Sequence, residues 1–118
     1  MTSDQGAIMR RNVLEVFAET DPARRLAVIT EIYAEEAVFY DPEGEVSGHE
    51  AINALVTRLQ AQDPSLRFRV LGEPRSLRDL ATVDWELGPA DGPAVMTGSD
   101  IALFEAGRIH TLYTLLHP

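Results

Sequence analysis

The chain has 118 residues, which suits a single domain, and carries a net charge of −9 from 10 basic and 19 acidic side chains. Hydrophobic residues make up 45% of it, which is enough for a packed core and too much for a disordered chain. The acidic balance argues against a nucleic-acid or anionic-membrane partner, because both need a basic patch. No apolar run reaches the roughly 18–20 residues of a membrane span, and the lack of cysteine excludes disulfides. We therefore expect one cytoplasmic domain over residues 1–118.

Three helical patterns come first in the chain. Asp21 followed by Pro22 predicts the start of the second helix, since aspartate is a good N-cap and proline suits the first helical position. Ser47 and Glu50 predict a capping box at the start of the third. The three apolar stripes at helical spacing are Ile8, Val13, Val16 and Phe17; Leu26, Ile29 and Tyr33; and Ile52, Leu55, Val56 and Leu59.

A period of two dominates the rest of the chain and predicts strands. The expected strands are 37–40, 66–71 with a resumption at 75–77, 81–87, 94–104 and 108–116. Helices followed by a long antiparallel meander indicate an α+β fold. A curved sheet wrapped on helices leaves a cone-shaped hollow, and Gly98 is a candidate for the bend that creates it.

Asp100 is the residue most suggestive of function. Alternation along its strand puts it on the same face as Met96, Gly98 and Ala102, so it is a carboxyl on an otherwise apolar face. A buried carboxyl is costly unless it is hydrogen-bonded or protonated. Two interpretations stay open: a structural acid held by a nearby donor, or a group that faces a cavity. A one-residue register slip would bury Ser99 and its face-mates instead.

Asp41 is a second candidate acid. It ends an early strand and precedes Pro42. An Asx turn explains this pattern without any chemistry. The functional alternative is a carboxylate that faces the same hollow as Asp100. His110, which opens the last strand close to a turn, could lie at the rim of that hollow or on the surface.

Four segments taken together resemble a known family. They are residues 33–42 (YAEEAVFYDP), 48–52 (GHEAI), 100–104 (DIALF) and 107–109 (GRI). In order and spacing they are similar to the nuclear transport factor 2-like superfamily, in its SnoaL-like and steroid delta-isomerase branch. The resemblance covers nearly the whole chain. It implies a cone-shaped α+β barrel, with a curved, mostly antiparallel sheet packed on three N-terminal helices.

The resemblance also implies roles for both acids. Asp41 matches the aspartate that shuttles a proton in steroid delta-isomerases, and Asp100 matches the protonated aspartate that donates a hydrogen bond to the developing oxyanion. Two family tyrosines are missing, because Phe17 and Val56 stand in their places, while Tyr33 matches a third. Losing one oxyanion donor typically costs about 2.7–4 kcal/mol of transition-state stabilisation.

Two functions are compatible with this pattern. The first is a pocket protein for a hydrophobic, carbonyl-bearing ligand (polyketide- or steroid-like), with Asp41 and Asp100 catalysing isomerisation or aldol-type cyclisation. The second is a non-catalytic ligand-binding or dimeric assembly module, which Phe17 and Val56 favour. The expected ligand-contacting residues are Phe17, Tyr33, Val56, Val83, Trp85, Leu87, Met96, Leu112, Thr114 and Leu116.

No metal or cofactor is expected, since the sequence has neither zinc-type histidine spacing nor a glycine-rich phosphate loop. The family implies a homodimer through the outer face of the sheet. Apolar residues on the outward side of the last two strands support this pairing independently. They are Val95, Ile101, Leu103, Tyr113 and Leu115.

Overall fold

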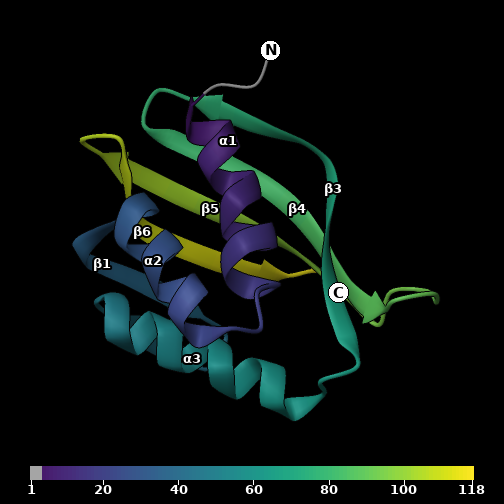
Figure 1. Cartoon of the computed structure of the whole chain (residues 1–118). Helices are drawn as coiled ribbons and strands as arrows, with labels where there is room; N and C mark the ends of the chain where they lie inside the picture. Colours follow the sequence, from purple (N-terminus) through teal and green to yellow (C-terminus); the bar gives the residue numbers. More distant parts are fainter. Residues whose placement is uncertain (1–3) are drawn as a thin grey trace.

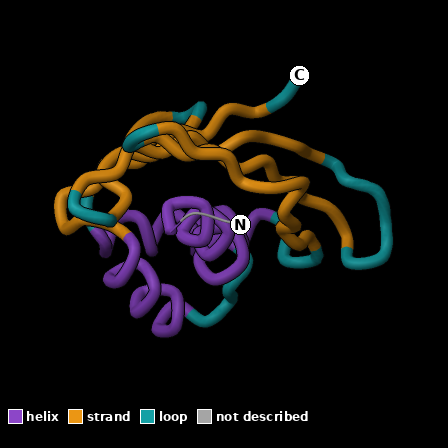
Figure 2. The backbone as a smooth tube through the Cα atoms, turned by 90° about the horizontal axis from the view of Figure 1, so that it is seen from above, coloured by secondary structure: helices purple, strands orange, loops and turns teal. Residues whose placement is uncertain are grey.

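A curved sheet arches over a group of helices that lie on its concave side (Figures 1 and 2). This arrangement comes from a computed structural model that describes residues 4–118. The helical elements are α1 (Asp4–Arg11), a π-helical continuation η1 (Asn12–Phe17), α2 (Pro22–Ile32) and α3 (His49–Gln62). The strands are β1 (Tyr33–Asp41), β2 (Gly44–Ser47), β3 (Leu66–Leu77), β4 (Leu80–Pro89), β5 (Met96–Glu105) and β6 (Arg108–Leu116).

The sheet has the order β2-β1-β6-β5-β4-β3. All neighbouring strands are antiparallel except β1 and β6, which run parallel. The expected α+β class, with a mostly antiparallel sheet on three helices, is confirmed, and the sheet stays open rather than closing into a full barrel. The parallel pair was not foreseen, because a parallel partner distant in the chain leaves no turn signal between the two strands.

The second helix begins as predicted. The Asp21 side chain accepts hydrogen bonds from the backbone N–H groups of Ala23 and Arg24, at 2.9 and 3.5 Å. The predicted capping box of the third helix is wrong: Gly48 is its N-cap, with φ +87° in the region that favours glycine, and Ser47 ends β2.

Tyr33 also lies outside its predicted helix. α2 ends at Ile32, and Tyr33 opens β1 opposite Ile109 on β6. Its apolar spacing with Ile29 fits a helix as well as a buried strand end, so the period alone could not decide. β2 was missed because only one of its four residues, Val46, is apolar.

The core lies between the helices and the concave face of the sheet. Its fully covered side chains come from both halves of the chain, among them Met9, Ile29, Phe39, Ile52 and Leu112. None of the helices in residues 4–118 is long and apolar enough to cross a membrane.

Candidate functional site

A cavity of about 550 Å³ opens between η1, the C-terminal end of α3 and the concave face of the sheet. Its inner wall is aromatic: Phe17, Phe39, Phe68 and Trp85 form a chain of edge-to-face contacts with ring centroids 5.3–5.9 Å apart. The size and the mostly apolar wall suit a small organic ligand, since such sites usually measure roughly 300–1,000 Å³.

Asp100 lies in the inner wall with only 4% of its surface exposed. Its Oδ1 accepts hydrogen bonds from Trp85 Nε1 at 3.0 Å and from Thr114 Oγ1 at 2.8 Å. Its Oδ2 accepts a longer one, 3.4 Å, from Asn12 Nδ2. Burial raises the pKa of Asp100 to about 6, while these three hydrogen bonds favour the charged form and oppose the rise. Asp100 is therefore mainly ionised at neutral pH, although its apolar face suggested a protonated acid.

Asn12 is itself held by a second buried side chain. Tyr33 donates its hydroxyl proton to Asn12 Oδ1 at 2.6 Å, and neither residue has any exposed surface. Burial raises the pKa of the Tyr33 hydroxyl well above its usual value, so this group remains a donor. The result is one connected chain, Tyr33–Asn12–Asp100, with Trp85 and Thr114 completing it from the sheet.

The register of the sheet explains why Trp85 reaches Asp100. Trp85 pairs with Gly98 across β4 and β5, and Asp100 lies two residues further along β5. A Cβ atom at Gly98 would come within 2.5 Å of the Trp85 ring and 2.8 Å of the Leu115 carbonyl oxygen. Gly98 therefore makes room for the indole to lie over the strand, which is a more specific role than the bend expected from the sequence.

Asp41 both forms an Asx turn and lines the cavity, as the two interpretations of the sequence predicted separately. Its Oδ1 accepts hydrogen bonds from the backbone N–H groups of Glu43 and Gly44, both at 2.9 Å, which is an Asx turn closing the β1–β2 hairpin. It also lines the same cavity as Asp100. Its second carboxyl oxygen has no hydrogen bond to any other residue of the described part, 4–118.

The structure brings most of the predicted ligand-contacting residues to the cavity. Those that line it are Phe17, Trp85, Leu87, Met96, Thr114 and Leu116. Four others are buried and do not line it: Tyr33, Val56, Val83 and Leu112. His110 also lies away from the cavity, beside Thr111 and 3.8 Å from Glu105.

Several residues of the site were not anticipated, among them Asn12, Phe39 and Phe68. The position of Asn12 on the inner face could have been predicted from the sequence. It is a polar residue at helical spacing from Met9 and Val16, which are fully buried. The two phenylalanines gave no signal beyond ordinary core pattern.

The site contains few groups that could hold a metal. No group of three or more histidine, aspartate or glutamate side chains is arranged as a metal site within residues 4–118.

The SnoaL-like domain model matches residues 11–111. The chain belongs to the SnoaL-like family, within the nuclear transport factor 2-like superfamily. No match is found among the curated proteins.

Several solved structures share the architecture described above. A candidate isomerase of the SnoaL-like family from Agrobacterium tumefaciens is 25% identical, with a TM-score of 0.89 over 98% of this chain and 100% of that one. A candidate ketosteroid isomerase from Kribbella flavida is 14% identical, with a TM-score of 0.72 over 99% of this chain and 80% of that one. A candidate polyketide cyclase from Sinorhizobium meliloti is 20% identical, with a TM-score of 0.66 over 87% and 93%. The last two likenesses concern the fold alone.

Proposed function

We propose that this SnoaL-like protein binds a hydrophobic, polyketide- or steroid-like ring ligand in the cavity and that Asp41 and Asp100 give it acid–base capability. The observation that carries the proposal is the presence of two carboxyl groups, 59 positions apart in the sequence, in the wall of one mostly apolar cavity. Apolar cavities with a few polar groups are the usual form of small-molecule sites. The candidate isomerases and cyclase of the same fold agree with this reading.

The reaction class we propose is proton transfer beside a carbonyl group, as in isomerisation or aldol-type cyclisation. Asp41 would take the proton with the carboxyl oxygen that its turn leaves free, and the neutral form of Asp100 would donate to the carbonyl oxygen. An apolar ligand that expels water from the cavity raises the pKa of Asp100 further, because it removes solvation of the charge.

The direct test is exchange of carbonyl-adjacent protons in D₂O, followed by NMR on a bicyclic ring ketone such as 2-decalone. We expect the protein to accelerate exchange most below about pH 6, where Asp100 is neutral. Asp41→Asn should abolish the acceleration, because it removes the base. Asp84→Asn is a matched control: that acid is also on the sheet, but it accepts a hydrogen bond from Ser99 and does not line the cavity. Unchanged exchange in Asp41→Asn would remove Asp41 from the mechanism.

A second candidate function is ligand binding without chemistry. It is favoured by Phe17, whose ring on the cavity wall has no hydroxyl to donate. The Trp85 and Thr114 donors nearby are already used by Asp100. Binding of ring ligands with no proton exchange at any pH would support this candidate over the enzyme.

A second copy of the chain is the partner we propose for the outer face of the sheet. Leu115 and Tyr113 on β6 are 57% and 41% exposed. Val95, which was expected on the same outer face, lines the cavity instead. Exposed apolar side chains gathered on one face usually mark an interaction surface.

A further inference from the structure

The hydrogen-bond donors at the inner end of the cavity already donate to another residue of the protein. Three polar residues line this part of the wall: Asp100, Trp85 and Thr114. The indole N–H of Trp85 and the hydroxyl of Thr114 each have one hydrogen to donate, and both donate it to Asp100 Oδ1. What remains there is acceptor capacity on the carboxyl group of Asp100.

The orientation of the Asn12 side-chain amide adds to this excess of hydrogen-bond acceptors over free donors. An asparagine amide could present either its oxygen or its nitrogen to Asp100. Because Tyr33 donates to Asn12 Oδ1, the Nδ2 group is the one that faces Asp100 Oδ2. All three neighbours of the carboxyl group are therefore donors, and they stabilise its ionised form. An ionised carboxylate has about four acceptor sites, and these three hydrogen bonds leave room for a further one.

From this arrangement we infer that ionised Asp100 selects ligands that bring a hydrogen-bond donor to the inner end of the cavity: an enol, a phenol or an alcohol hydroxyl. A bare carbonyl oxygen finds no donor there and is disfavoured for as long as Asp100 carries its charge. The inference rests on the proposed ligand-binding function and refines it by naming the group that meets Asp100.

Charged residues at the rim of the cavity should also discriminate between ligands by their charge. Asp41, Glu43 and Asp63 line it, with Arg67 as the basic residue in the lining. Three acids against one base disfavour an anionic ligand, so a carboxylate of the same ring system should bind worse than the alcohol.

The preference for the alcohol should weaken as pH falls, because a neutral carboxylic acid gains one O–H donor while it keeps an acceptor oxygen. The pKa of Asp100 is raised to about 6 by burial, and the titratable group in contact with its network is Tyr33, which stays protonated. Four ionisable groups on the elements packed against Asp100 have partners of their own: Glu15 pairs with Arg11, Asp84 with Ser99, Glu86 with Arg69, and His110 with Glu105. The charged groups Glu35, Glu36 and Arg108 on these elements do not line the cavity. Asp41, at the end of β1, lines the same cavity and is tested separately by Asp41→Asn.

Trp85 provides the readout, since it is the single tryptophan of the chain and lines the cavity beside Asp100. The probes are 2-decalol, 2-decalone and decalin-2-carboxylate, which share one ring system and do not fluoresce. At about pH 7.5 we expect the alcohol to bind at least roughly tenfold more tightly than the ketone, because a hydrogen bond to a charged acceptor is worth about that much. At about pH 5 the difference should shrink to within roughly threefold, because neutral Asp100 can donate to the ketone.

Two variants test the residues that set this preference. Asp100→Asn should make the alcohol-to-ketone ratio independent of pH, since an amide does not titrate. Tyr33→Phe frees the Asn12 amide to turn its oxygen toward Asp100, which favours the neutral acid. The pH at which the preference for the alcohol is lost should therefore rise by about half a unit or more. Asp84→Asn, the matched control, should leave both ratio and midpoint unchanged.

The possible outcomes distinguish a failure of this inference from a failure of the proposed ligand-binding function. Ketone and alcohol binding equally at about pH 7.5, or a ratio that ignores pH in the unmodified protein, would overturn the selection by Asp100 while leaving the binding function intact. If none of the probes binds at either pH, the proposed function fails and the inference falls with it. If Asp100→Asn does not fold, a Tyr33→Phe variant that loses the alcohol preference at the same pH as the unmodified protein still contradicts the role given to the Tyr33–Asn12 pair.

Discussion

At the scale of single residues, Asp100 holds a carboxyl group inside the core with almost no contact with water. Three hydrogen bonds offset part of the cost of burying its charge, and no cationic side chain donates to it. Buried acids without a cation partner are held at a cost in stability, which is why they are more common at functional sites than elsewhere.

This cost leads to a prediction about pH and stability. The pKa of Asp100 rises from 3.8 to about 6 on folding. Between these values the folded protein binds more protons than the unfolded chain, so the free energy of unfolding falls as pH rises from about 4 to about 6. Relative to Asp100→Asn, which does not titrate, the unmodified protein should lose about 2 kcal/mol between pH 4 and 7.5. Urea unfolding of both proteins at the two pH values measures the difference, and a constant difference would contradict the raised pKa.

The residue scale also shows what the sequence could supply about the site. Alternation along one strand was enough to place Asp100 on the inner face, because a period of two leaves only two choices. It could not supply Asn12 or the role of Tyr33, because these meet Asp100 only through contacts between η1, β1 and β5, far apart in the chain. Nor could it show that the donors near Asp100 are already used.

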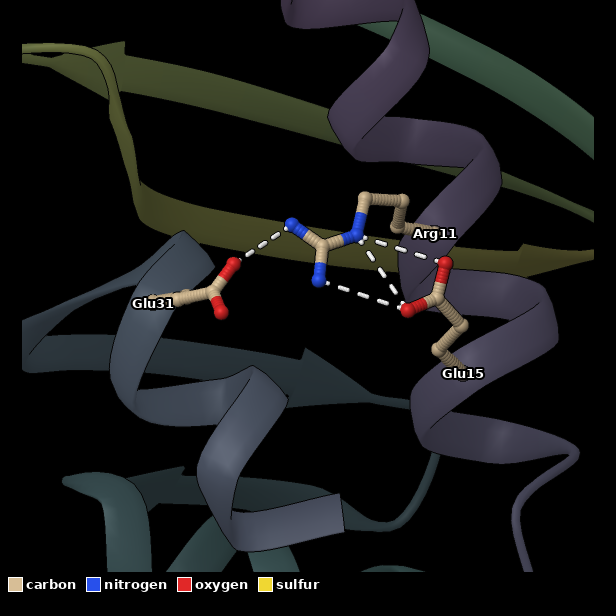
Figure 3. A network of polar contacts seen from close by, with 3 residues as sticks. All are labelled: Arg11, Glu15 and Glu31. Atoms are coloured by element: carbon tan, nitrogen blue, oxygen red, sulfur yellow. Dashed lines mark hydrogen bonds and ion pairs between the residues drawn. The ribbon is translucent and has the colours of Figure 1, made fainter. Parts of the chain in front are cut away.

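At the scale of elements, two arginines join the helices in different ways. Arg11, at the end of α1, reaches Glu31 on α2 at 2.7 Å and Glu15 on η1 at 3.3 Å, on the surface (Figure 3). Arg25 on α2 is fully buried and donates to Asn53 Oδ1 at 2.8 Å. Its guanidinium also donates to Thr57 Oγ1, Gln60 Oε1 and the Glu19 carbonyl oxygen. The second cluster ties α2 to α3 and to the chain after η1.

We predict unequal costs for replacing these arginines. Arg25→Lys should lower the free energy of unfolding by roughly 1–3 kcal/mol, because an ammonium group cannot reproduce the planar set of donors and leaves partly buried acceptors unpaired. Arg11→Gln should cost less than about 1 kcal/mol, because its carboxylate partners remain hydrated. Chemical denaturation of the two variants in parallel gives the comparison. Equal costs would mean that the buried cluster contributes no more than the surface one.

A second prediction at this scale concerns Gly98. Gly98→Ala should destabilise the protein by roughly 1–3 kcal/mol, because the added methyl group meets the Trp85 ring and the Leu115 carbonyl oxygen. The Trp85 emission maximum should move with it, since the ring must shift away from Asp100. Gly107→Ala is the comparison for a glycine with open space around it, although its φ of +80° adds backbone strain of its own. Gly98→Ala with unchanged emission would exclude the proposed fit between ring and strand.

Local patterns predicted most elements and failed at particular ones. β3 even resumes after a bulge between Leu71 and Arg75, as the sequence indicated. The π-helical turn at η1 has no comparable signature, because its dihedral angles are close to those of an α-helix and its residues keep the same apolar spacing.

At the scale of the whole molecule, the sheet has one face covered by helices and one face open (Figure 2). We predict that the protein is a dimer at micromolar concentration and that Leu115→Glu makes it a monomer, because a charge would be buried between the two copies. Leu14→Glu places the same charge on an exposed leucine of η1, 44% exposed, and should leave the dimer intact. Multi-angle light scattering distinguishes the two states, and a monomeric unmodified protein would contradict the prediction.

The position of β6 in the sheet has a consequence for biosynthesis. It lies between β1 and β5 and joins the N-terminal part of the sheet to the β5–β4–β3 meander, yet it is the last of the six strands to leave the ribosome. Until it emerges, β1 lacks its parallel neighbour and Asp100 lacks Thr114, so the sheet exists as two unjoined parts. Nascent chains stalled before β6 should therefore be sensitive to proteases and recruit chaperones, whereas chains stalled far enough beyond it should resist digestion.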